Sequence, residues 1–401
     1  MRACCCMYLV IFTAMQIVLF EDRHWSEFLP LVYTRPVGDL RMGMMTMAER
    51  YAAWMNVEVV HETRAHLQSI FLSPTSEQQL HVNARLFPDQ HLVAALHALQ
   101  ANEVLHHNGQ LLARRISALT DGEDVVKEYA HTPIWLDTIT DLFSKNAYAM
   151  ASDFALIGVK ESSAPVHSSN VIIGHSEMLY IHPSAKVYAS SINTLDGPVY
   201  IDEDAEVMEG SHIRGPFYLG KHSTLKLGTK IYGATTIGPH CKVGGEVSNS
   251  VVWGFSNKAH DGFLGNSLIG EWCNLGADTN TSNLKNNYSS VRIWNYTHSS
   301  FTDTGLTFCG LIMGDHSKCG INTMFNTGTV AGVCANVFGA GFPDKHVASF
   351  LWGGAEGWEE YQLEKALTTI EKVMQRRSLP LTEEMREMLS TLFDETRNQR
   401  L

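Results

Sequence analysis

Large aliphatic residues return at every sixth position through the middle of the chain. An α-helix repeats every 3.6 residues and an alternating strand every two, so neither explains this spacing. A period of six is typical of a parallel β-helix, in which each short strand points one aliphatic side chain into a narrow core. The main series is Ile201, Val207, Ile213, Leu219, Leu225, Ile231, Ile237 and Val243.

The fifth member of each hexapeptide that begins at one of these positions is mostly small or β-branched. Small residues suit the tight turns of such a solenoid. The fifth members are Ala205, Ser211, Ser223, Thr229, Thr235, Cys241 and Val247, with Phe217 as the exception.

The same spacing continues on both sides of the main series. The further inward positions predicted are Ile181, Val187 and Leu195 before it, and Phe263, Ile269, Leu275, Met313, Cys319, Phe325, Ala331 and Val337 after it. They predict a solenoid over about residues 175–342, within a domain at 166–345. The phase breaks after Val243, and this break contains His260. Because insertions in a solenoid often line its binding face, we expect a loop to leave the solenoid there.

The segments outside the solenoid have other patterns. Apolar runs alternate with helical stretches over residues 15–165, which predicts an α/β domain. Residues 346–401 have helical spacing, with Thr382 as a plausible N-cap, and predict a helical cap over the open solenoid end. Residues 1–14 are apolar and Arg-led. We interpret them as an N-terminal extension, with an export signal as the alternative.

Composition excludes some function classes. The net charge is −12, from 30 basic and 42 acidic residues, and no basic cluster is present. Nucleic acid is therefore not an expected partner, and neither is a membrane. The cysteines beyond the first six residues form no CxxC pair, which predicts buried thiols in a reducing, cytoplasmic compartment. They are Cys241, Cys273, Cys309, Cys319 and Cys334.

Three short segments resemble a known family. The segment NKAHDGFLGNSLIGEWCNLGADTNTSN is similar to the acetyltransferase segment of the bifunctional GlmU family. TRPVGDLRMG and GEVSNS are similar to an alternate bacterial branch of it. The resemblance implies a divergent sugar-1-phosphate nucleotidyltransferase domain followed by a left-handed β-helix. The implied reaction of the β-helix is acetyl-CoA-dependent N-acetylation of an amino-sugar 1-phosphate, in a homotrimer that makes a UDP-N-acetylglucosamine-type nucleotide sugar.

The resemblance also implies roles for single residues of the second domain. His260 stands where the family has its general base, and a histidine side chain can accept a proton near neutral pH. Asn274 and Asn283 match positions where the family has asparagines that bind substrate. Asparagines are also common turn residues, so a purely structural role is the alternative. Phe263 replaces a family tyrosine. The family's basic pair for the sugar phosphate has no clear counterpart, and the candidates for that charge are Lys230, Lys258, Lys285 and Arg292.

The first domain departs further from the family, because its Gly-rich phosphate loop is absent. Arg35, Asp39 and Arg41 are candidates for binding nucleotide phosphate or Mg²⁺, and Asn83 and Arg85 are a second candidate pair. A nucleoside triphosphate and Mg²⁺ would be its substrates and cofactor if it is active. The alternatives are a surface ion-pair cluster and a domain that kept its fold without its activity.

Two function classes stay open from the sequence. One is an enzyme that transfers an acetyl group, with or without nucleotidyl transfer. The other is a non-catalytic sugar-nucleotide-binding protein or trimeric scaffold. A nucleotidyltransferase whose β-helix is only structural lies between them.

Overall fold

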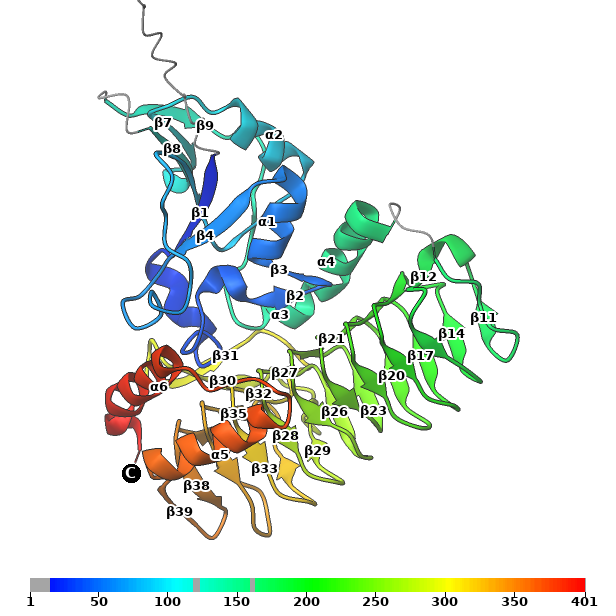
Figure 1. Cartoon of the computed structure of the whole chain (residues 1–401). Coiled ribbons are helices and arrows are strands. Elements are labelled where there is room, and N and C mark those ends of the chain that lie inside the picture. Colours follow the sequence, from blue (N-terminus) through cyan, green and yellow to red (C-terminus); the bar gives the residue numbers. More distant parts are fainter. Residues whose placement is uncertain (1–14, 118–122, 159–162, 401) are drawn as a thin grey trace, which may run out of the picture.

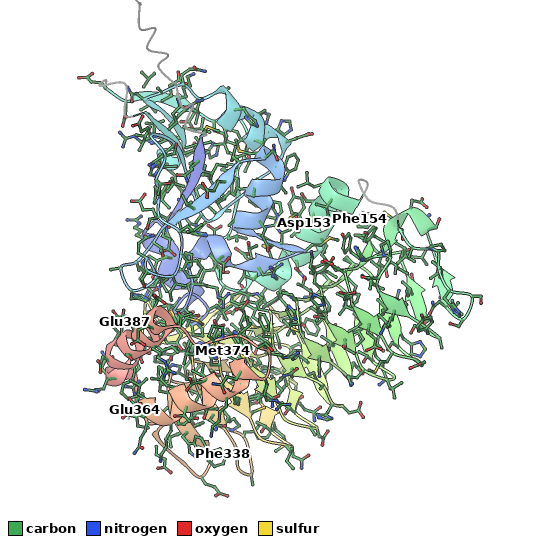
Figure 2. All side chains as sticks on the ribbon, viewed as in Figure 1. Asp153, Phe154, Phe338, Glu364, Met374 and Glu387 are labelled. Atoms are coloured by element: carbon green, nitrogen blue, oxygen red, sulfur yellow. The ribbon has the colours of Figure 1, made fainter. Side chains whose placement is uncertain are left out.

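The computed structural model describes residues 15–117, 123–158 and 163–400, and it shows a sheet domain docked on the side of a long solenoid (Figure 1). The predicted extension at residues 1–14 lies outside the described residues. Among those that are described, no helix has the length and apolar character needed to cross a membrane. Side chains fill the space between the two parts (Figure 2).

The first domain is built on a six-stranded mixed sheet. Its order is β4-β1-β5-β8-β7-β9, with β1 parallel to β4 and β5 and β8 antiparallel to β5 and β7. The central position of β1 explains its continuous apolar run, because both of its faces are covered. The strands are β1 (Gln16–Phe20), β4 (Glu58–Glu62), β5 (Gln78–Asn83), β7 (Glu103–His107), β8 (Gln110–Ser117) and β9 (Val125–Glu128).

Short helices and small strand pairs complete this domain. Helix α1 begins at a capping box, in which the Thr46 hydroxyl accepts from the Glu49 amide and the Glu49 carboxylate accepts from the Thr46 amide. The α-helices are α1 (Met47–Met55), α2 (Gln90–Ala98), α3 (Asp141–Ser144) and α4 (Asn146–Asp153), and the short turns of 3₁₀ or π helix are η1 (Arg23–Phe28), η2 (Val37–Asp39) and η3 (Phe154–Gly158). The small strands are β2 (Arg41–Met42), β3 (Met45–Thr46), β6 (Leu86–Phe87) and β10 (Ile134–Trp135).

The second domain is a parallel β-helix with three faces, each a stack of short strands. The docked face, against which the first domain lies, has strands β12 (Leu179–Ile181), β15 (Val199–Ile201), β18 (Phe217–Leu219), β21 (Thr235–Ile237), β24 (Val251–Val252), β27 (Leu268–Ile269), β32 (Ile312–Met313), β35 (Val330–Ala331) and β37 (His346–Val347).

The chain passes from the docked face to the lateral face and then to the outer face in each coil. The lateral face has β13 (Lys186–Val187), β16 (Glu206–Val207), β19 (Thr224–Leu225), β22 (Lys242–Val243), β25 (Asn257–Lys258), β28 (Asn274–Leu275), β33 (Lys318–Cys319), β36 (Asn336–Val337), β38 (Leu351–Gly354) and β39 (Gly357–Glu360). The outer face has β11 (Val171–Ile173), β14 (Ser191–Asn193), β17 (His212–Arg214), β20 (Lys230–Tyr232), β23 (Glu246–Ser248) and β26 (Phe263–Gly265), followed by the pair β29 (Asn280–Thr281) and β34 (Met324–Phe325).

The predicted period of six is confirmed, because all eight aliphatic residues of the main series are buried in the solenoid core. Two further positions were wrong. Leu195 is 58% exposed, and Ile192 is the inward residue of its strand. Phe263 points outward, and its neighbour Leu264 pairs with Val247 in the core. In both cases the inward position is taken by a different apolar residue within a few positions. Spacing alone does not distinguish between the two candidates.

The small fifth-position residues have a second use besides fitting the turns. The Ser223 hydroxyl donates to the Gly238 carbonyl at 2.6 Å and accepts from the Cys241 amide at 2.8 Å. It thereby satisfies two backbone groups of the next coil that would otherwise be buried without a partner. The five described cysteines are free and buried, as predicted, and burial raises the pKa of the Cys241 thiol to about 12.

The loop expected at the phase break is not there. Between Val243 and Val247 the chain turns through Gly244 and Gly245, and this short corner shifts the phase by shortening one coil. The segment that leaves the solenoid lies later, between β29 and β32. It carries the hairpin of β30 (Arg292–Asn295) and β31 (Ser300–Asp303).

This inserted hairpin and the docked face together hold the first domain. The side chain of Asn295 donates to Glu27 at 2.7 Å, and the Thr236 hydroxyl donates to the Gly43 carbonyl at 2.7 Å. One apolar core runs through both parts. Its solenoid members are Val251, Trp253, Leu268, Val291, Ile293, Cys309, Ile312 and Val330.

Helices α5 (Leu363–Gln375) and α6 (Glu383–Glu395) confirm the predicted helical C-terminus, and Thr382 accepts from the Met385 amide as the N-cap. They do not lie over the solenoid end as expected. They pack along the corner between the docked and lateral faces, with Met374 directed at the solenoid (Figure 2). Their core also includes Tyr33 and Leu67 of the first domain, so the helices brace the two parts against each other.

Candidate functional site

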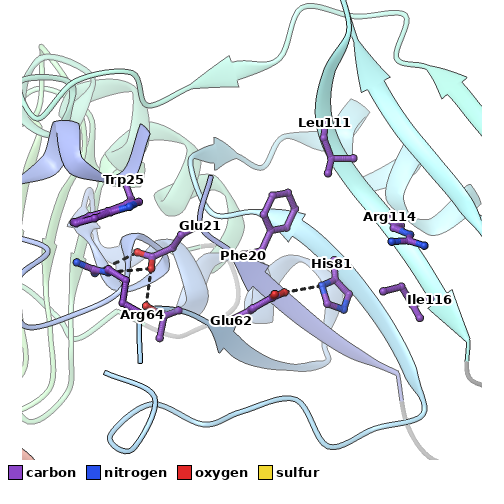
Figure 3. Close-up of a pocket in the computed structure, with 10 residues that line it drawn as sticks. Phe20, Glu21, Trp25, Glu62, Arg64, His81, Leu111, Arg114 and Ile116 are labelled. Carbon is purple, nitrogen blue, oxygen red and sulfur yellow. Dashed lines mark hydrogen bonds and ion pairs between the residues drawn. The ribbon is translucent and has the colours of Figure 1, made fainter. Parts of the chain in front are cut away.

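A hollow of about 500 Å³ opens in the first domain beside the carboxyl ends of β1 and β4 (Figure 3). Ligands of open α/β sheets commonly bind outside the carboxyl ends of the parallel strands. The lining residues come from β1, β4, β5 and β8 and from the turns after β1 and β4. They are Phe20, Glu21, Trp25, Glu62, Thr63, Arg64, His81, Leu111, Arg114 and Ile116.

Arg64 and Glu21 form the polar centre of this hollow. The Arg64 guanidinium pairs with the Glu21 carboxylate at 3.3 Å and lies over the Trp25 ring, 4.3 Å from its centre. Its Nη1 atom is buried and has no hydrogen-bond partner among the described residues. Burial lowers the pKa of Arg64 in spite of Glu21. One buried cationic N–H group at the wall of the hollow is therefore left without an acceptor among the described residues.

Asn83 and Arg85, predicted to bind nucleotide, instead hold an aspartate at the end of β1. The Asn83 amide donates to Asp22 at 2.9 Å, and Arg85 pairs with Asp22 at 2.7 Å. Burial opposes ionisation of Asp22, but these hydrogen bonds outweigh it and lower its pKa to about 2. Arg85 is 2% exposed, so direct phosphate binding by it has no support in the structure.

Glu21 and Asp22 were missed in the sequence, although their signal was present. Two acidic residues directly follow a buried strand, where side chains reach the edge of the sheet. Both carboxylates are engaged by arginines, and the described residues contain no group of three acidic, histidine or cysteine side chains that could hold a metal ion. These residues do not form a ready magnesium site.

Arg35 and Asp39 also serve another purpose than the predicted one. Arg35 is 7% exposed, forms ion pairs with Asp315 and Glu271 of the solenoid and with Asp39, and lies over the Trp253 ring. Burial raises the pKa of Asp39 to about 7, against the effect of Arg35. This cluster holds the first domain on the solenoid. Because the Arg35 guanidinium is occupied by these ion pairs, it is not free to bind a nucleotide.

Arg41 lies apart from the hollow described above. It donates to the Met44 carbonyl at 2.8 Å and pairs with Glu49 at 3.0 Å, beside a second hollow of about 480 Å³ between the first domain and the docked face. The structure therefore does not gather the five predicted nucleotide-binding residues into one site.

His260 lies at the corner between the lateral and outer faces, in the bend that joins β25 to β26. It is exposed to solvent. Its backbone carbonyl accepts a hydrogen bond of 2.6 Å from the Lys258 ammonium group. The bend is thus anchored from the inside of the solenoid while the imidazole stays accessible.

The two predicted asparagines lie on different sides of this corner. Asn274 is exposed on the lateral face, next to Asn257 in register. Asn283 follows the outer-face strand β29 and donates to Asn266 at 2.8 Å. The Phe263 ring and the Asn283 amide both lie over Gly265, where an added Cβ would come within 2.5 Å and 2.6 Å of them. One chain therefore builds an open corner rather than an enclosed pocket around His260.

The four cations predicted to bind a sugar phosphate differ in their surroundings. Lys258 takes an inward core position, where it donates to the Gly244 and His260 carbonyls and burial lowers its pKa to about 8. Its ammonium group cannot reach a ligand outside the solenoid. Lys285 donates to the Ser290 carbonyl in the inserted segment, Arg292 donates within the hairpin, and Lys230 is exposed on the outer face.

Comparisons with known proteins bear mainly on the first domain. Residues 17–161 match the family model described as sugar nucleotidyl transferase. The chain is 34% identical over 146 residues to a bifunctional sugar-1-phosphate nucleotidylyltransferase/acetyltransferase of Sulfurisphaera tokodaii, covering 36% of each chain. It is 33% identical over 87 residues to the bifunctional protein GlmU of Methanocaldococcus jannaschii, covering 22% of this chain and 21% of that one.

The matched stretches thus span about a third and a fifth of the lengths of these two relatives. Among solved structures, the UDP-N-acetylglucosamine acyltransferase of Francisella novicida aligns with a TM-score of 0.32 and 16% identity, over 57% of this chain and 79% of that one. Residues 17–161 therefore match a sugar nucleotidyl transferase family model, and part of the chain is similar to part of two bifunctional nucleotidyltransferase/acetyltransferase relatives.

Proposed function

We propose that the chain is a bifunctional enzyme of nucleotide-sugar synthesis. The first domain joins a sugar 1-phosphate to a nucleoside triphosphate, and the second transfers an acetyl group from acetyl-CoA to an amino-sugar 1-phosphate. The observation that carries the proposal is the coincidence of two features. The matched domain has a hollow at the carboxyl ends of its parallel strands, and the hollow is lined by Arg64, whose buried Nη1 has no partner among the described residues.

In the first domain, a phosphate oxygen of the sugar 1-phosphate would attack the α-phosphorus of the nucleotide. A new P–O bond forms, the bond to the β-phosphate oxygen breaks, and pyrophosphate leaves. Arg64 and Arg114 are the guanidinium groups in the lining and are proposed to contact the phosphates, beside the carboxylates of Glu21 and Glu62. Asp22, held by Asn83 and Arg85, stays ionised and keeps the end of β1 in place.

In the second domain, His260 would accept a proton from the amine as it attacks the thioester carbon of acetyl-CoA. The C–N bond forms, the C–S bond breaks, and the thiolate takes up a proton as coenzyme A leaves. The His260 imidazole is accessible at the corner between the lateral and outer faces, and this supports the proposed role. Asn274 and Asn283, on either side of the corner, are proposed to bind the substrates.

The open corner also supports the proposed homotrimer. A substrate at His260 would be covered on one side only, so a neighbouring subunit is expected to supply the remaining wall. The outer face supports this because no described helix packs on it, while the first domain and α5 cover parts of the other two faces. Sedimentation equilibrium at micromolar concentration should give the mass of three chains, and the mass of one chain would contradict the trimer.

The experiment that tests the bifunctional proposal uses two assays on the same purified protein. Release of pyrophosphate is followed with UTP or dTTP, a panel of sugar 1-phosphates and Mg²⁺, with and without EDTA. Release of thiol is followed with acetyl-CoA and amino-sugar 1-phosphates. We expect both activities, and loss of the first in EDTA because Mg²⁺ commonly accompanies nucleotide phosphates. Absence of both would favour the non-catalytic scaffold.

A further inference from the structure

A third hollow, of about 510 Å³, lies on the lateral face under the end of α5, and its charged lining is entirely basic. We call it the basic hollow. Its cations are Lys242, Lys318, Arg376 and Arg377, and its lining includes no acidic residue. None of the four forms an ion pair with any residue in the described part of the chain. In a chain of net charge −12 this is an unusual concentration of one sign.

The register of the lateral face explains how two of these cations meet. Lys242, Asn257, Asn274 and Lys318 follow one another at the same outward position of successive strands β22, β25, β28 and β33. The sheet therefore presents two lysines with two amide side chains between them, in a row across the coils.

The helix supplies the other half of the lining. Arg376 and Arg377 directly follow the last residue of α5, where cations also interact favourably with the helix dipole. That explanation does not extend to Lys242 and Lys318, which lie on the sheet. Four like charges around one hollow repel one another. A bound anion removes this repulsion, so the arrangement is suited to an anionic ligand.

A second observation concerns the middle of the row. The Oδ1 atom of Asn257 is buried, and no residue that the structure describes donates a hydrogen bond to it. Leaving a buried amide oxygen without a donor is costly, and a ligand with an N–H or O–H group would satisfy it. Phe255 and Trp272 stack on each other, with ring centres 4.2 Å apart, and add an apolar wall.

The basic hollow reaches the corner of His260, because Ala259, the residue before it, is part of the lining. We propose that the basic hollow binds the phosphate end of a substrate of the second domain, with Asn257 accepting from an N–H or O–H group of the same molecule. This inference rests on the proposed acetyltransferase function. Coenzyme A and the amino-sugar phosphate share this chemistry, and its volume is within the usual range for ligand pockets.

The test reverses two exposed charges of the hollow, Lys242→Glu and Arg376→Glu, in the full-length protein. The matched control is Lys186→Glu with Lys372→Glu. It makes the same change in net charge on the same face and near the same helix end, since Lys186 is an exposed lateral-face lysine of β13 and Lys372 is an exposed residue in the last turn of α5, both outside the hollow. Circular dichroism confirms that each double variant folds.

Calorimetry then measures the binding of coenzyme A and, separately, of glucosamine 1-phosphate. We expect the hollow variant to weaken the binding of at least one of them by about tenfold or more, and the control to change it less than about twofold. The ligand that is affected identifies the source of the phosphate. Equal binding by both variants, or no binding of either compound by the unmodified protein, would overturn the proposal.

Because binding is measured without turnover, the result separates two failures. If the basic hollow binds coenzyme A but the protein releases no thiol, the ligand-binding proposal holds and the acetyltransferase proposal is contradicted. If the protein acetylates normally with both charges reversed, the acetyltransferase proposal holds and the ligand-binding proposal for the basic hollow is contradicted.

Discussion

The two candidate sites differ in how completely one chain builds them. The hollow of the first domain is lined by four strands and the turns after two of them, with Arg64 and Glu21 paired and mostly buried. The corner at His260 is a single bend, with Asn274 and Asn283 on separate faces. A sheet with loops at its edge can surround a ligand alone, whereas a convex solenoid corner needs a neighbour. The assembly state should therefore matter for one activity and not for the other.

The strongest test of this contrast is His260→Ala. Loss of a positioned general base should reduce acetyl transfer by about 10²–10⁴-fold. Nucleotidyl transfer and thermal stability should stay unchanged, because His260 is exposed and makes no core contact. The control is His212→Ala, an exposed histidine of the outer face. Undiminished thiol release by a folded His260→Ala protein would refute the assignment.

The next test asks how far the first domain depends on the solenoid. Arg35→Ala leaves the Asp315 and Glu271 carboxylates facing each other without their cation. Breaking such a buried cluster usually costs about 3–5 kcal/mol. Arg214→Ala, which removes an exposed ion pair, should cost less than about 1 kcal/mol.

Hydrogen exchange reports this directly. We expect faster exchange in Arg35→Ala at the docking surfaces of both parts, and no change in the solenoid far from them. Unaltered exchange at the interface would mean that the apolar core alone holds the two parts together.

A smaller effect is expected from Arg64→Gln in the first hollow. Removing a charged donor to a phosphate costs about 1.5–3 kcal/mol, which is about 10–100-fold in the kcat/KM for pyrophosphate release. Acetyl transfer should be unaffected. Arg23→Gln is the control, since Arg23 is an exposed residue of the neighbouring turn η1. Equal activities of the two variants would remove Arg64 from the site.

The smallest expected effect concerns acid stability beside the basic hollow. Burial lowers the pKa of His316 to about 3, so between pH 6.5 and 3 the unfolded chain binds a proton that the folded chain does not. The stability associated with neutral His316 is fully present above pH 6.5, and it is lost as the pH falls below 6.5. His316→Phe should reduce the loss of unfolding free energy between pH 6.5 and 5 by at most about 2 kcal/mol. Denaturant titrations at both pH values measure it, and an unchanged pH dependence would contradict the prediction.

The sequence predicted regular parts of the molecule better than contacts between distant parts. The six-residue period identified the solenoid because every coil repeats the same burial pattern, as at Ile213 and Ile231. It did not predict that Arg35 meets Asp315, 280 positions away, since no local pattern encodes docking. Lys258 shows the same limit from inside a repeat, because its inward position depends on the shortened corner at Gly244 and Gly245.

The triangular cross-section of the solenoid has a consequence for the transfer of an intermediate between the two proposed active sites. The first domain covers the docked face, and the corner that carries His260 is the edge opposite that face. An intermediate made at one site and consumed at the other would therefore have to leave the protein surface and diffuse around the solenoid. An added scavenging enzyme should therefore intercept the intermediate as readily as it would between two separate proteins.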